Sequence, residues 1–396
     1  MTPLSLMPDW DALAAFLWWP ALLNLILVAT CLGLLILGRL RVRSLRNVPI
    51  SDRDAWPSVS LIAPARNEEL HIERAVRSLT KLDYPNLEIA IINDRSTDRT
   101  GEILDSLAAE FPQLTVVHLT DLPAGWLGKN HALQLGADRS RGDWLLFADA
   151  DIVFEPTTLR RALCYATANN VDHLTAWPRV EAPSWLLSVF MLTFALYLFL
   201  FVRVWSIRNR NSTAHIGIGA FNLIKREVYR AVGGHSRIQM RPDDDLKLGK
   251  IIKAAGYQQD LVDSNGLLSL EMYGSIRELI HGLEKNMFSG TDYSIALTVF
   301  SSVLSLACNV WPFLALFLIP PPTFWLYVAV CLTLWAMALG SARVMQVPAS
   351  RALAFPLGVL LFVYIQWRTM LLNYYHGGIR WRNTHYSLAE LRANKV

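Results

Sequence analysis

Charged residues are scarce in this chain of 396 residues. Only 18% are Asp, Glu, Lys or Arg, whereas 53% are hydrophobic. In a soluble globular protein about a quarter of all residues are charged. The high apolar content also excludes an intrinsically disordered chain. The composition therefore argues against a purely soluble protein.

Basic runs and cysteine frameworks are missing as well. The net charge is only +4, and no soluble segment interleaves basic with aromatic residues, so nucleic acid is not expected as a partner. Of the four cysteines, three lie inside apolar runs. Their spacing fits neither a disulfide framework nor a zinc site.

Long uncharged runs are abundant. Residues 12–38 and 293–342 contain no Asp, Glu, Lys or Arg over 27 and 50 residues. Because about 20 apolar residues cross a bilayer, we expect one span in the first run and two in the second, at about 294–318 and 323–342. A shorter run at 352–367 leaves open whether it also spans the membrane.

The flanks of the first run predict its orientation. Asp9 and Asp11 precede it, whereas a basic cluster follows it, made of Arg39, Arg41, Arg43 and Arg46. The run is too long for a signal peptide and lacks a basic segment before it. The positive-inside rule then predicts a multi-pass protein of the inner (plasma) membrane, with the soluble part of the chain in the cytoplasm.

Short β-rich runs alternate with helical stretches between residue 58 and about residue 180. Strands are expected at 58–63, 87–93, 114–119 and 143–148, and helices near 67–81, at 98–110, after Lys129 and near 157–169. Continuous apolar strands that alternate with helices are typical of a parallel sheet covered on both faces. Ligands of such α/β sheets gather at the carboxyl ends of the strands.

The distribution of hydrophobic and charged residues along the chain predicts five parts. They are an N-terminal anchor with a basic stop at 1–46, a linker at 47–57, an α/β domain at 58–290, a C-terminal transmembrane region at 291–375 and a basic tail at 376–396.

Residues 182–202 form an uncharged run inside the α/β domain. The run is long enough to cross a bilayer. A single crossing would, however, place Asp149 and Asp151, which precede the run, and Asp245, which follows it, on opposite sides of the membrane, although one active site requires them on the same side. We therefore expect it to be membrane-associated without crossing. A buried helix of the soluble core is the alternative.

Acidic residues stand where predicted strands end or a helix begins. Asp94 ends one strand, Asp149 and Asp151 end another, and Asp243–Asp245 precede a helix. Side chains two residues apart on an extended segment point to the same face. Asp149 and Asp151 are therefore expected to share a hard cation with a diphosphate, as Mg²⁺ or Mn²⁺ prefers. A solvated turn or helix cap is the alternative.

Several motifs occur in a fixed order along the chain. They are Pro64-Ala65-Arg66-Asn67-Glu68, Asp83-Tyr84-Pro85, Asn93-Asp94 and Asp149-Ala150-Asp151. Together they resemble the nucleotide-binding half of the family 2 inverting glycosyltransferases of the GT-A fold, over about residues 58–290. The segment GWLGKN at 125–130 and the closing HGGIRW tail look most like membrane-bound members that act on carotenoid or other polyisoprenoid-type lipids.

The resemblance implies a fold and a donor site. The fold is an α/β, Rossmann-like GT-A catalytic domain with a mostly parallel sheet and with N- and C-terminal transmembrane helices. Nucleotide-sugar-binding residues are implied at Pro64, Ala65, Arg66, Glu68, Asp94, Lys129 and Asp149. The implied ligands of Mg²⁺ or Mn²⁺ are Asp151 and Asp149. Lys129 read by itself could also be an exposed lysine in the first turn of a helix.

The acidic cluster resembles the stretch that supplies the base in this family. In DDLKLG at 244–249, Asp245 takes the place of the base and Asp244 that of the neighbouring Glu. An inverting transfer needs a carboxylate to remove the proton from the acceptor hydroxyl. Three adjacent carboxylates should raise the pKa of at least one of them. The alternative is an acidic cluster that caps a helix.

One departure from the family pattern limits the product. Processive members carry Gln-x-x-Arg-Trp after the base, and here residues 281–286 read HGLEKN. No tryptophan platform for a growing sugar chain is present, so a long polysaccharide product is not expected. Lys285 in this stretch is a candidate cation for the leaving diphosphate.

The sequence thus predicts a hexosyltransferase that moves a single sugar, with inversion, from a nucleotide-diphosphate sugar to a hydroxyl of a membrane lipid. UDP-hexose is the expected donor. The expected partners are this donor, the lipid acceptor and the membrane. The alternatives are a short-chain polysaccharide synthase and a catalytically silent membrane scaffold that retains the nucleotide fold.

Overall fold

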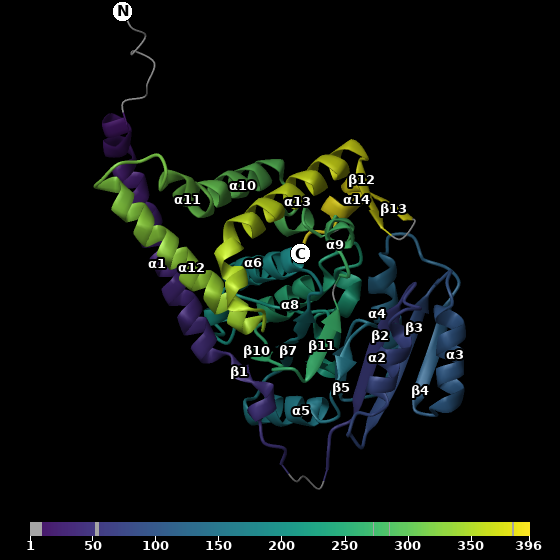
Figure 1. Ribbon diagram of the computed structural model, residues 1–396. Coiled ribbons are helices and arrows are strands. Elements are labelled where there is room, and N and C mark those ends of the chain that lie inside the picture. Colours follow the sequence, from purple (N-terminus) through teal and green to yellow (C-terminus); the bar gives the residue numbers. More distant parts are fainter. Residues whose placement is uncertain (1–9, 52–54, 272, 285, 382–383) are drawn as a thin grey trace, which may run out of the picture. The chain divides into compact units, whose positions relative to one another are not determined.

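The computed structural model describes residues 10–51, 55–271, 273–284, 286–381 and 384–396 (Figure 1). The chain forms two compact units. The α/β unit consists of Leu40–Glu181, Val202–Met272 and His376–Val396, and the helical unit of Met1–Arg39, Ala182–Phe201 and Tyr273–Tyr375.

An eight-stranded sheet forms the centre of the α/β unit. In spatial order its strands are β1 (Arg43–Ser44), β10 (Gln259–Asp263), β7 (His173–Trp177), β9 (Asn222–Lys225), β5 (Trp144–Phe147), β2 (Val59–Ala65), β3 (Leu87–Asp94) and β4 (Leu114–Leu119). Only β9 runs antiparallel to its neighbours β5 and β7 within this sheet. The predicted mostly parallel sheet is confirmed.

Helices cover both faces of the sheet, because alternate residues of its apolar strands face opposite sides. Leu61 and Ile91 belong to the core on one face, whereas Ile62 and Ile92 belong to the core on the other. The first core includes residues of α2 (Ile72–Leu79), α3 (Thr100–Glu110) and α5 (Thr158–Ala168), and the second includes residues of α4 (Gly128–Arg139), α7 (Arg226–Ala231) and α8 (Asp244–Ala254).

One predicted helix begins later than expected. The sequence predicts a helix near 67–81, but α2 begins at Ile72. Asn67 adopts a left-handed φ of 55°, and its Oδ1 accepts a hydrogen bond from the Thr97 N–H at 2.8 Å. Asn side chains favour such turns over helix interiors, so the residues before α2 remain a loop at the edge of the sheet.

A second, three-stranded sheet lies in the same unit. Its central strand β11 (Leu268–Glu271) pairs antiparallel with β6 (Val153–Phe154) and parallel with β8 (Arg179–Glu181).

The chain returns to the α/β unit after its last long helix. This tail contains β12 (Gly378–Trp381), β13 (Thr384–Ser387) and α14 (Leu388–Ala393). The Asn394 Oδ1 accepts a hydrogen bond from the Met240 N–H at 3.1 Å, and the Lys250 Nζ donates to the Val396 carbonyl at 2.6 Å. The tail is therefore anchored on the α/β unit.

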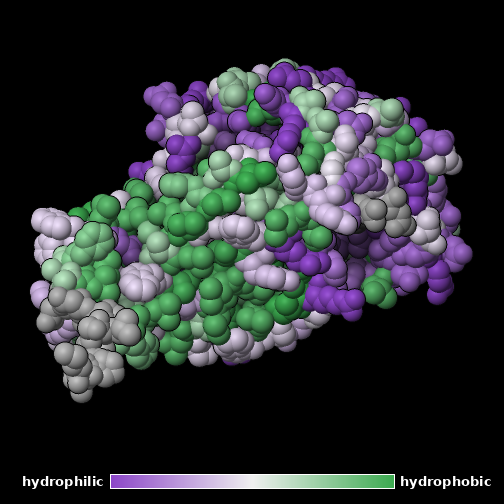
Figure 2. Space-filling view, turned by 90° about the horizontal axis from the view of Figure 1, so that it is seen from above, coloured by the Kyte–Doolittle hydropathy of each residue, from purple (hydrophilic) through white to green (hydrophobic). Residues whose placement is uncertain are grey.

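Five helices of the described residues are long and apolar enough to cross a membrane, which confirms the predicted membrane helices at both ends of the chain. These segments contain α1 (Trp10–Arg41), α6 (Trp185–Val202), α10 (Ile295–Asn309) with α11 (Trp311–Ala315), α12 (Thr323–Val344) and α13 (Phe355–Tyr375), while the shorter α9 (Ile276–Leu283) precedes α10. Hydrophobic residues cover a broad part of the face seen in Figure 2. Exposed large hydrophobic side chains lie on α1, α10, α12 and α13. The predicted span at 294–318 is interrupted after Asn309, and Pro312, which lacks an N–H, stands at the start of α11.

Small and hydroxyl residues bring the long helices into close contact. The Ser341 Oγ of α12 donates to the Leu192 carbonyl of α6 at 2.7 Å. At Gly358 of α13 a Cβ would collide with Thr193 of α6. Such residues are typical of contacts between membrane helices. Helix α6 therefore packs among the other long helices of its unit.

A buried histidine makes the sheet sensitive to acid. The His173 Nε2 donates to the Asn222 Oδ1 at 2.7 Å, its Nδ1 accepts from the Gln259 Nε2 at 2.9 Å, and burial lowers its pKa to about 4. An unfolded histidine binds a proton near pH 6.5, so His173 costs stability as the pH falls from about 6.5 towards 4, by about 2 kcal/mol at pH 5.

We expect His173→Gln to reduce this acid sensitivity. The midpoint of thermal unfolding, followed in detergent, should fall less between pH 7 and pH 5 in the variant than in the parent protein. The same pH response in both proteins would show that His173 is not held neutral in the fold.

Candidate active site

Acidic and basic residues from five segments stand at one edge of the large sheet. They come from the end of β2 and its loop, from the end of β3, from the loop after β5 and from the first turns of α4 and α8. Because β2, β3 and β5 are parallel neighbours, their carboxyl ends meet at this edge.

Lys129 in the first turn of α4 connects two of these segments. Its Nζ lies 2.8 Å from the Asp149 Oδ1 and 3.5 Å from the Asp244 Oδ2, and its side chain is only 22% exposed. Burial by itself lowers the pKa of Lys129, but the charges of Asp149, Asp244 and Asp245 outweigh it and raise the pKa. Lys129 is therefore a partly buried, ion-paired lysine and not an exposed one at the start of a helix.

Asp245 is held in place by backbone N–H groups. Its Oδ2 accepts a hydrogen bond from the Gly219 N–H at 2.8 Å, and its Oδ1 accepts one from the Leu246 N–H at 2.7 Å. The Gly219 carbonyl in turn accepts from the Asp149 N–H at 2.9 Å. Gly219 thus joins the loop after β5 to the start of α8.

The pKa of Asp245 is raised, as expected, but for a different reason. Burial is the main cause and Asp149 adds to it, against the opposing charge of Lys129. The adjacent carboxylates have partners of their own, since the Arg241 Nε lies 2.9 Å from the Asp243 Oδ1 and Lys129 lies beside Asp244. The prediction that the adjacent carboxylates would raise the pKa was therefore wrong about the cause at Asp245, where burial raises it.

Asp149 and Asp151 are arranged differently from the prediction. Strand β5 ends at Phe147, and Ala150 and Asp151 form a turn, so the extended spacing assumed for this pair is wrong. Asp149 lies beside Lys129, whereas the Oδ1 of Asp151 is buried with no hydrogen-bond partner among the described residues. Burial raises the pKa of Asp151 to about 7, and Asp149 and Glu68 add to the rise. Asp149, Asp151 and Glu68 are therefore close enough to affect the ionisation of Asp151.

These carboxylates fit a divalent cation that is shared with a ligand. No cluster of three His, Cys, Asp or Glu residues that could hold a metal alone is present in the described part of the chain. Mg²⁺ usually binds through one or two carboxylates together with substrate phosphates. The partnerless Asp151 oxygen and the excess of negative charge around Lys129 suit this arrangement.

Asp94 at the end of β3 has two arginine partners. The Arg95 Nε lies 2.8 Å from its Oδ1, and the Arg66 Nη1 lies 3.5 Å from its Oδ2. A Cβ at Gly128, the first residue of α4, would collide with Asp94. Asp94 is therefore buried, paired with arginine and in contact with Gly128, the residue that precedes Lys129.

Two residues near Asp94 were not predicted from the sequence. Arg95 directly follows Asp94, and Tyr386 of the C-terminal tail is close enough to interact with Asp94, Arg95 and the Gly128 N–H. Burial raises the pKa of Tyr386. Because Tyr386 follows Asp94 by almost 300 residues, no local sequence pattern indicates that it approaches this site.

The remaining predicted residues lie in different surroundings. Glu68 is close enough to Asp151 to raise its pKa, and Pro64 is partly exposed in β2. Ala65 is fully buried in the core, so its side chain faces the protein interior. Lys285 lies outside the described residues.

Comparison with known proteins identifies the domain. The family model described as "Glycosyl transferase family 2" matches residues 60–233. The chain carries a glycosyl transferase family 2 domain.

Curated relatives match this domain over different lengths. The 4,4'-diaponeurosporenoate glycosyltransferase of Staphylococcus aureus (strain USA300) is 26% identical over 270 residues, which are 63% of this chain and 68% of the relative. The beta-monoglucosyldiacylglycerol synthase of Synechocystis sp. is 40% identical over 112 residues, or 28% of this chain and 23% of the relative. The probable glycosyltransferase YdaM of Bacillus subtilis is 36% identical over 110 residues, or 27% and 26%. The match thus spans about a quarter of the length of the last two relatives.

A solved structure shows the same fold. The mannosyltransferase PcManGT from Pyrobaculum calidifontis, in complex with GDP-Man and Mn²⁺, superposes with a TM-score of 0.52 at 19% identity, over 92% of this chain and 98% of its own. The predicted fold class is confirmed.

Gly219 offers a direct test of the site's geometry. A Cβ at this position would lie 2.5 Å from the Asp149 Oδ2, so Gly219→Ala must displace the carboxylate of Asp149. Because a misplacement of 1 Å can cost about 100-fold in rate, we expect turnover to fall about 100-fold while the thermal unfolding midpoint stays near that of the parent. Gly290→Ala, where no atom lies within 4 Å of the added Cβ, is the matched control. Parent-like turnover of Gly219→Ala would contradict this geometry.

Proposed function

We propose that this protein is a metal-dependent, membrane-anchored glycosyltransferase that transfers one sugar, with inversion, from a nucleotide-diphosphate sugar to a hydroxyl of a membrane lipid. UDP-hexose is the proposed donor. The observation that carries the proposal is the set of carboxylates around Lys129, with the partnerless oxygen of Asp151, at the strand ends of a glycosyl transferase family 2 domain.

The donor is proposed to lie between the Asp94 end and the Lys129 end of the site. Arg66 and Glu68, with the loop after β2, would bind the nucleoside together with Asp94, and Lys129 would attract the diphosphate. Mg²⁺ or Mn²⁺, held by Asp151 with help from Asp149, would stabilise charge on the leaving phosphate. The Mn²⁺ in the mannosyltransferase complex is consistent with this proposal.

Asp245 is proposed as the general base. Its raised pKa makes it a better proton acceptor than an ordinary surface carboxylate. The acceptor oxygen forms a bond to the anomeric carbon while the bond from that carbon to the phosphate oxygen breaks, and Asp245 takes the hydroxyl proton. Asp244 acts through its ion pair with Lys129 and is a positioning residue. Lys285 stays a predicted cation for the leaving diphosphate.

The acceptor is proposed to be a lipid. The names of two relatives refer to a carotenoid acid and to a glucosyldiacylglycerol, and five described helices are apolar enough to span a membrane.

The path of the chain constrains the proposed topology. If the α/β unit lies on the cytoplasmic side of the inner membrane, the chain leaves that side at Glu181 and is back at Val202, so α6 enters the membrane without crossing it. The chain leaves again at Met272 and is back at His376, after three candidate spans. Both ends lie on one side only if the number of crossings is even, so at most two of these three segments cross the membrane.

Asp245→Asn tests the base assignment. The asparagine keeps the shape of the side chain but cannot take up the proton, so we expect sugar transfer to fall by at least about 100-fold, the range typical of general acid–base catalysis. Binding of UDP, measured by calorimetry, should stay within about twofold of the parent, because the base contacts the acceptor and not the nucleotide.

Asp121→Asn, on an exposed loop, is the matched control and should transfer sugar like the parent. Normal turnover of Asp245→Asn would disprove the base. Loss of UDP binding together with turnover would assign Asp245 to the donor instead. A parent protein that binds UDP without transferring sugar to any lipid would favour the silent scaffold.

A further inference from the structure

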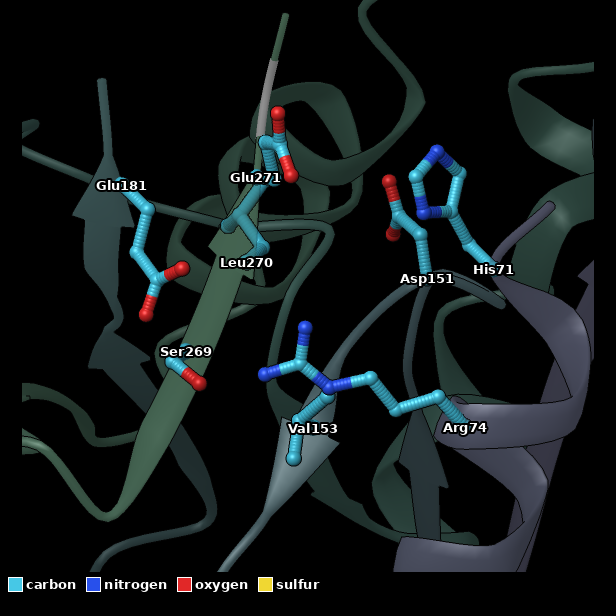
Figure 3. A pocket seen from close by; sticks show the side chains of 8 residues that line it. All are labelled: His71, Arg74, Asp151, Val153, Glu181, Ser269, Leu270 and Glu271. Carbon is cyan, nitrogen blue, oxygen red and sulfur yellow. The ribbon is translucent and has the colours of Figure 1, made fainter. Parts of the chain in front are cut away.

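The pocket beside Asp151 belongs to the active site. His71 and Arg74 are among its lining residues (Figure 3), and it has room for about one water and not for a lipid head group. A concentration of positive charge lies elsewhere on the α/β unit, at the end of the large sheet that is formed by β1 and β10.

Five exposed arginines of the α/β unit make up this basic surface. Two come from the end of α1 and from β1, and three from the segment that follows α6; they are Arg41, Arg43, Arg203, Arg208 and Arg210. The Arg41 Nη1 donates a hydrogen bond to the Trp205 carbonyl. Two segments that are more than 150 residues apart are therefore joined into one surface.

The segment after α6 is held in a fixed conformation. The Lys253 Nζ donates hydrogen bonds to the carbonyls of Ile207 and Asn209 at 2.7 Å and 2.8 Å, and the Gln258 Nε2 donates to the Arg208 carbonyl at 2.9 Å. Because these backbone groups have partners within the fold, the arginines stand on an ordered loop. A ligand that binds them loses less of its binding energy in ordering the protein.

The basic surface has little negative charge to balance it. The Arg208 Nε lies 3.6 Å from the Asp260 Oδ2, and the Asp260 side chain is only 7% exposed. Asp260 also accepts a hydrogen bond from the Tyr165 hydroxyl at 2.7 Å. The other four arginines form no ion pair with a carboxylate of the described residues. The surface therefore keeps an excess of positive charge that faces solvent.

The basic surface stands where two candidate membrane segments end. Arg41 is the last residue of α1, and Arg203 directly follows α6. Leu40, beside Arg41, is 78% exposed, as expected for a residue that meets apolar lipid. A cluster of four to eight basic residues on the cytoplasmic side of a membrane segment typically attracts anionic lipids. The guanidinium group also matches the geometry of phosphate oxygens.

We propose that the basic surface binds the anionic phospholipid head groups of the cytoplasmic leaflet. The inference goes beyond the proposed reaction, which needs no such lipid, and rests on it only for the cytoplasmic placement of the α/β unit. The loop that carries Arg203, Arg208 and Arg210 continues to Gly219, whose N–H donates to Asp245 at 2.8 Å. Lipid bound there holds the proposed base near the membrane surface, where an apolar acceptor presents its hydroxyl.

Thermal unfolding of the full-length protein in a neutral detergent tests the proposal. The midpoint is followed while phosphatidylglycerol, phosphatidylcholine or inorganic phosphate is added. A ligand that binds only the folded state raises its stability. We expect phosphatidylglycerol to raise the midpoint by at least about 3 °C, whereas equal concentrations of phosphatidylcholine or inorganic phosphate raise it by less than about 1 °C.

The triple variant R43Q/R203Q/R210Q removes three charges of the basic surface. It leaves Arg41 and Arg208 in place, because they bind the Trp205 carbonyl and Asp260. Each basic residue near an anionic surface contributes about fivefold in affinity. We therefore expect the phosphatidylglycerol concentration for half of the rise to increase by at least about tenfold in this variant.

The matched control R139Q/R141Q/R230Q loses the same number of exposed arginines outside the basic surface and should respond to phosphatidylglycerol like the parent. An equal response of the two triple variants overturns the assignment of the surface. A rise of equal size with phosphatidylcholine overturns the charge requirement and the proposal with it.

The remaining outcomes separate the lipid from other ligands and from the proposed function. A rise of equal size with inorganic phosphate overturns the lipid and assigns the surface to a soluble phosphate compound. A response to phosphatidylglycerol that is lost in R43Q/R203Q/R210Q, in a parent protein that transfers no sugar, supports this inference and overturns the proposed function alone. If the triple variant does not fold, the double variant R43Q/R210Q gives the same comparison.

Discussion

The ion pairs made by the partly buried ammonium group of Lys129 are the interactions on which the arrangement of the site depends. This ammonium group lies within ion-pair distance of Asp149 and Asp244, which come from the loop after β5 and the start of α8, and Lys129 itself stands in α4. Replacing Lys129 would leave the buried carboxylate of Asp244, whose side chain is 6% exposed, without this partner, which destabilises the fold. Three segments far apart in the sequence are thereby held at one edge of the sheet.

The positions of the other site residues follow from this constraint. Asp149 is also joined through Gly219 to Asp245, so the proposed base is held relative to Lys129 by backbone hydrogen bonds. The carboxylates around Lys129 outnumber the single ammonium, and Asp151 retains a partnerless oxygen. The site is therefore arranged for a further cation, and a diphosphate bound to that cation would complete the charge balance. At the other end, Arg66 and Arg95 already balance Asp94.

The sequence was sufficient for the fold and for the placement of three acidic residues at one edge of the sheet. Apolar strands at regular spacing predicted β2, β3, β4 and β5, and polar residues after strands marked Asp94, Asp149 and Asp151, because the ends of parallel strands meet at one edge. It was not sufficient where contacts between distant segments decide the structure. The late start of α2 depends on the hydrogen bond from the Thr97 N–H to Asn67, which lies about 30 residues away in the sequence from its partner. The turn at Ala150 and Asp151 follows a strand that ends earlier than its apolar residues indicate. The approach of Tyr386 to Asp94 depends on how the tail packs, and no local pattern encodes that packing.

The central claim is that the carboxylates near Lys129 bind a nucleoside diphosphate through a divalent cation, and calorimetric titration of the full-length protein with UDP tests it most directly. The account predicts UDP binding in Mn²⁺ that weakens by at least about tenfold, or about 1.4 kcal/mol, when a chelator replaces Mn²⁺ or when Asp151 is changed to Ala. Equal affinity with Mn²⁺ and with chelator, or unchanged binding by Asp151→Ala, would contradict it.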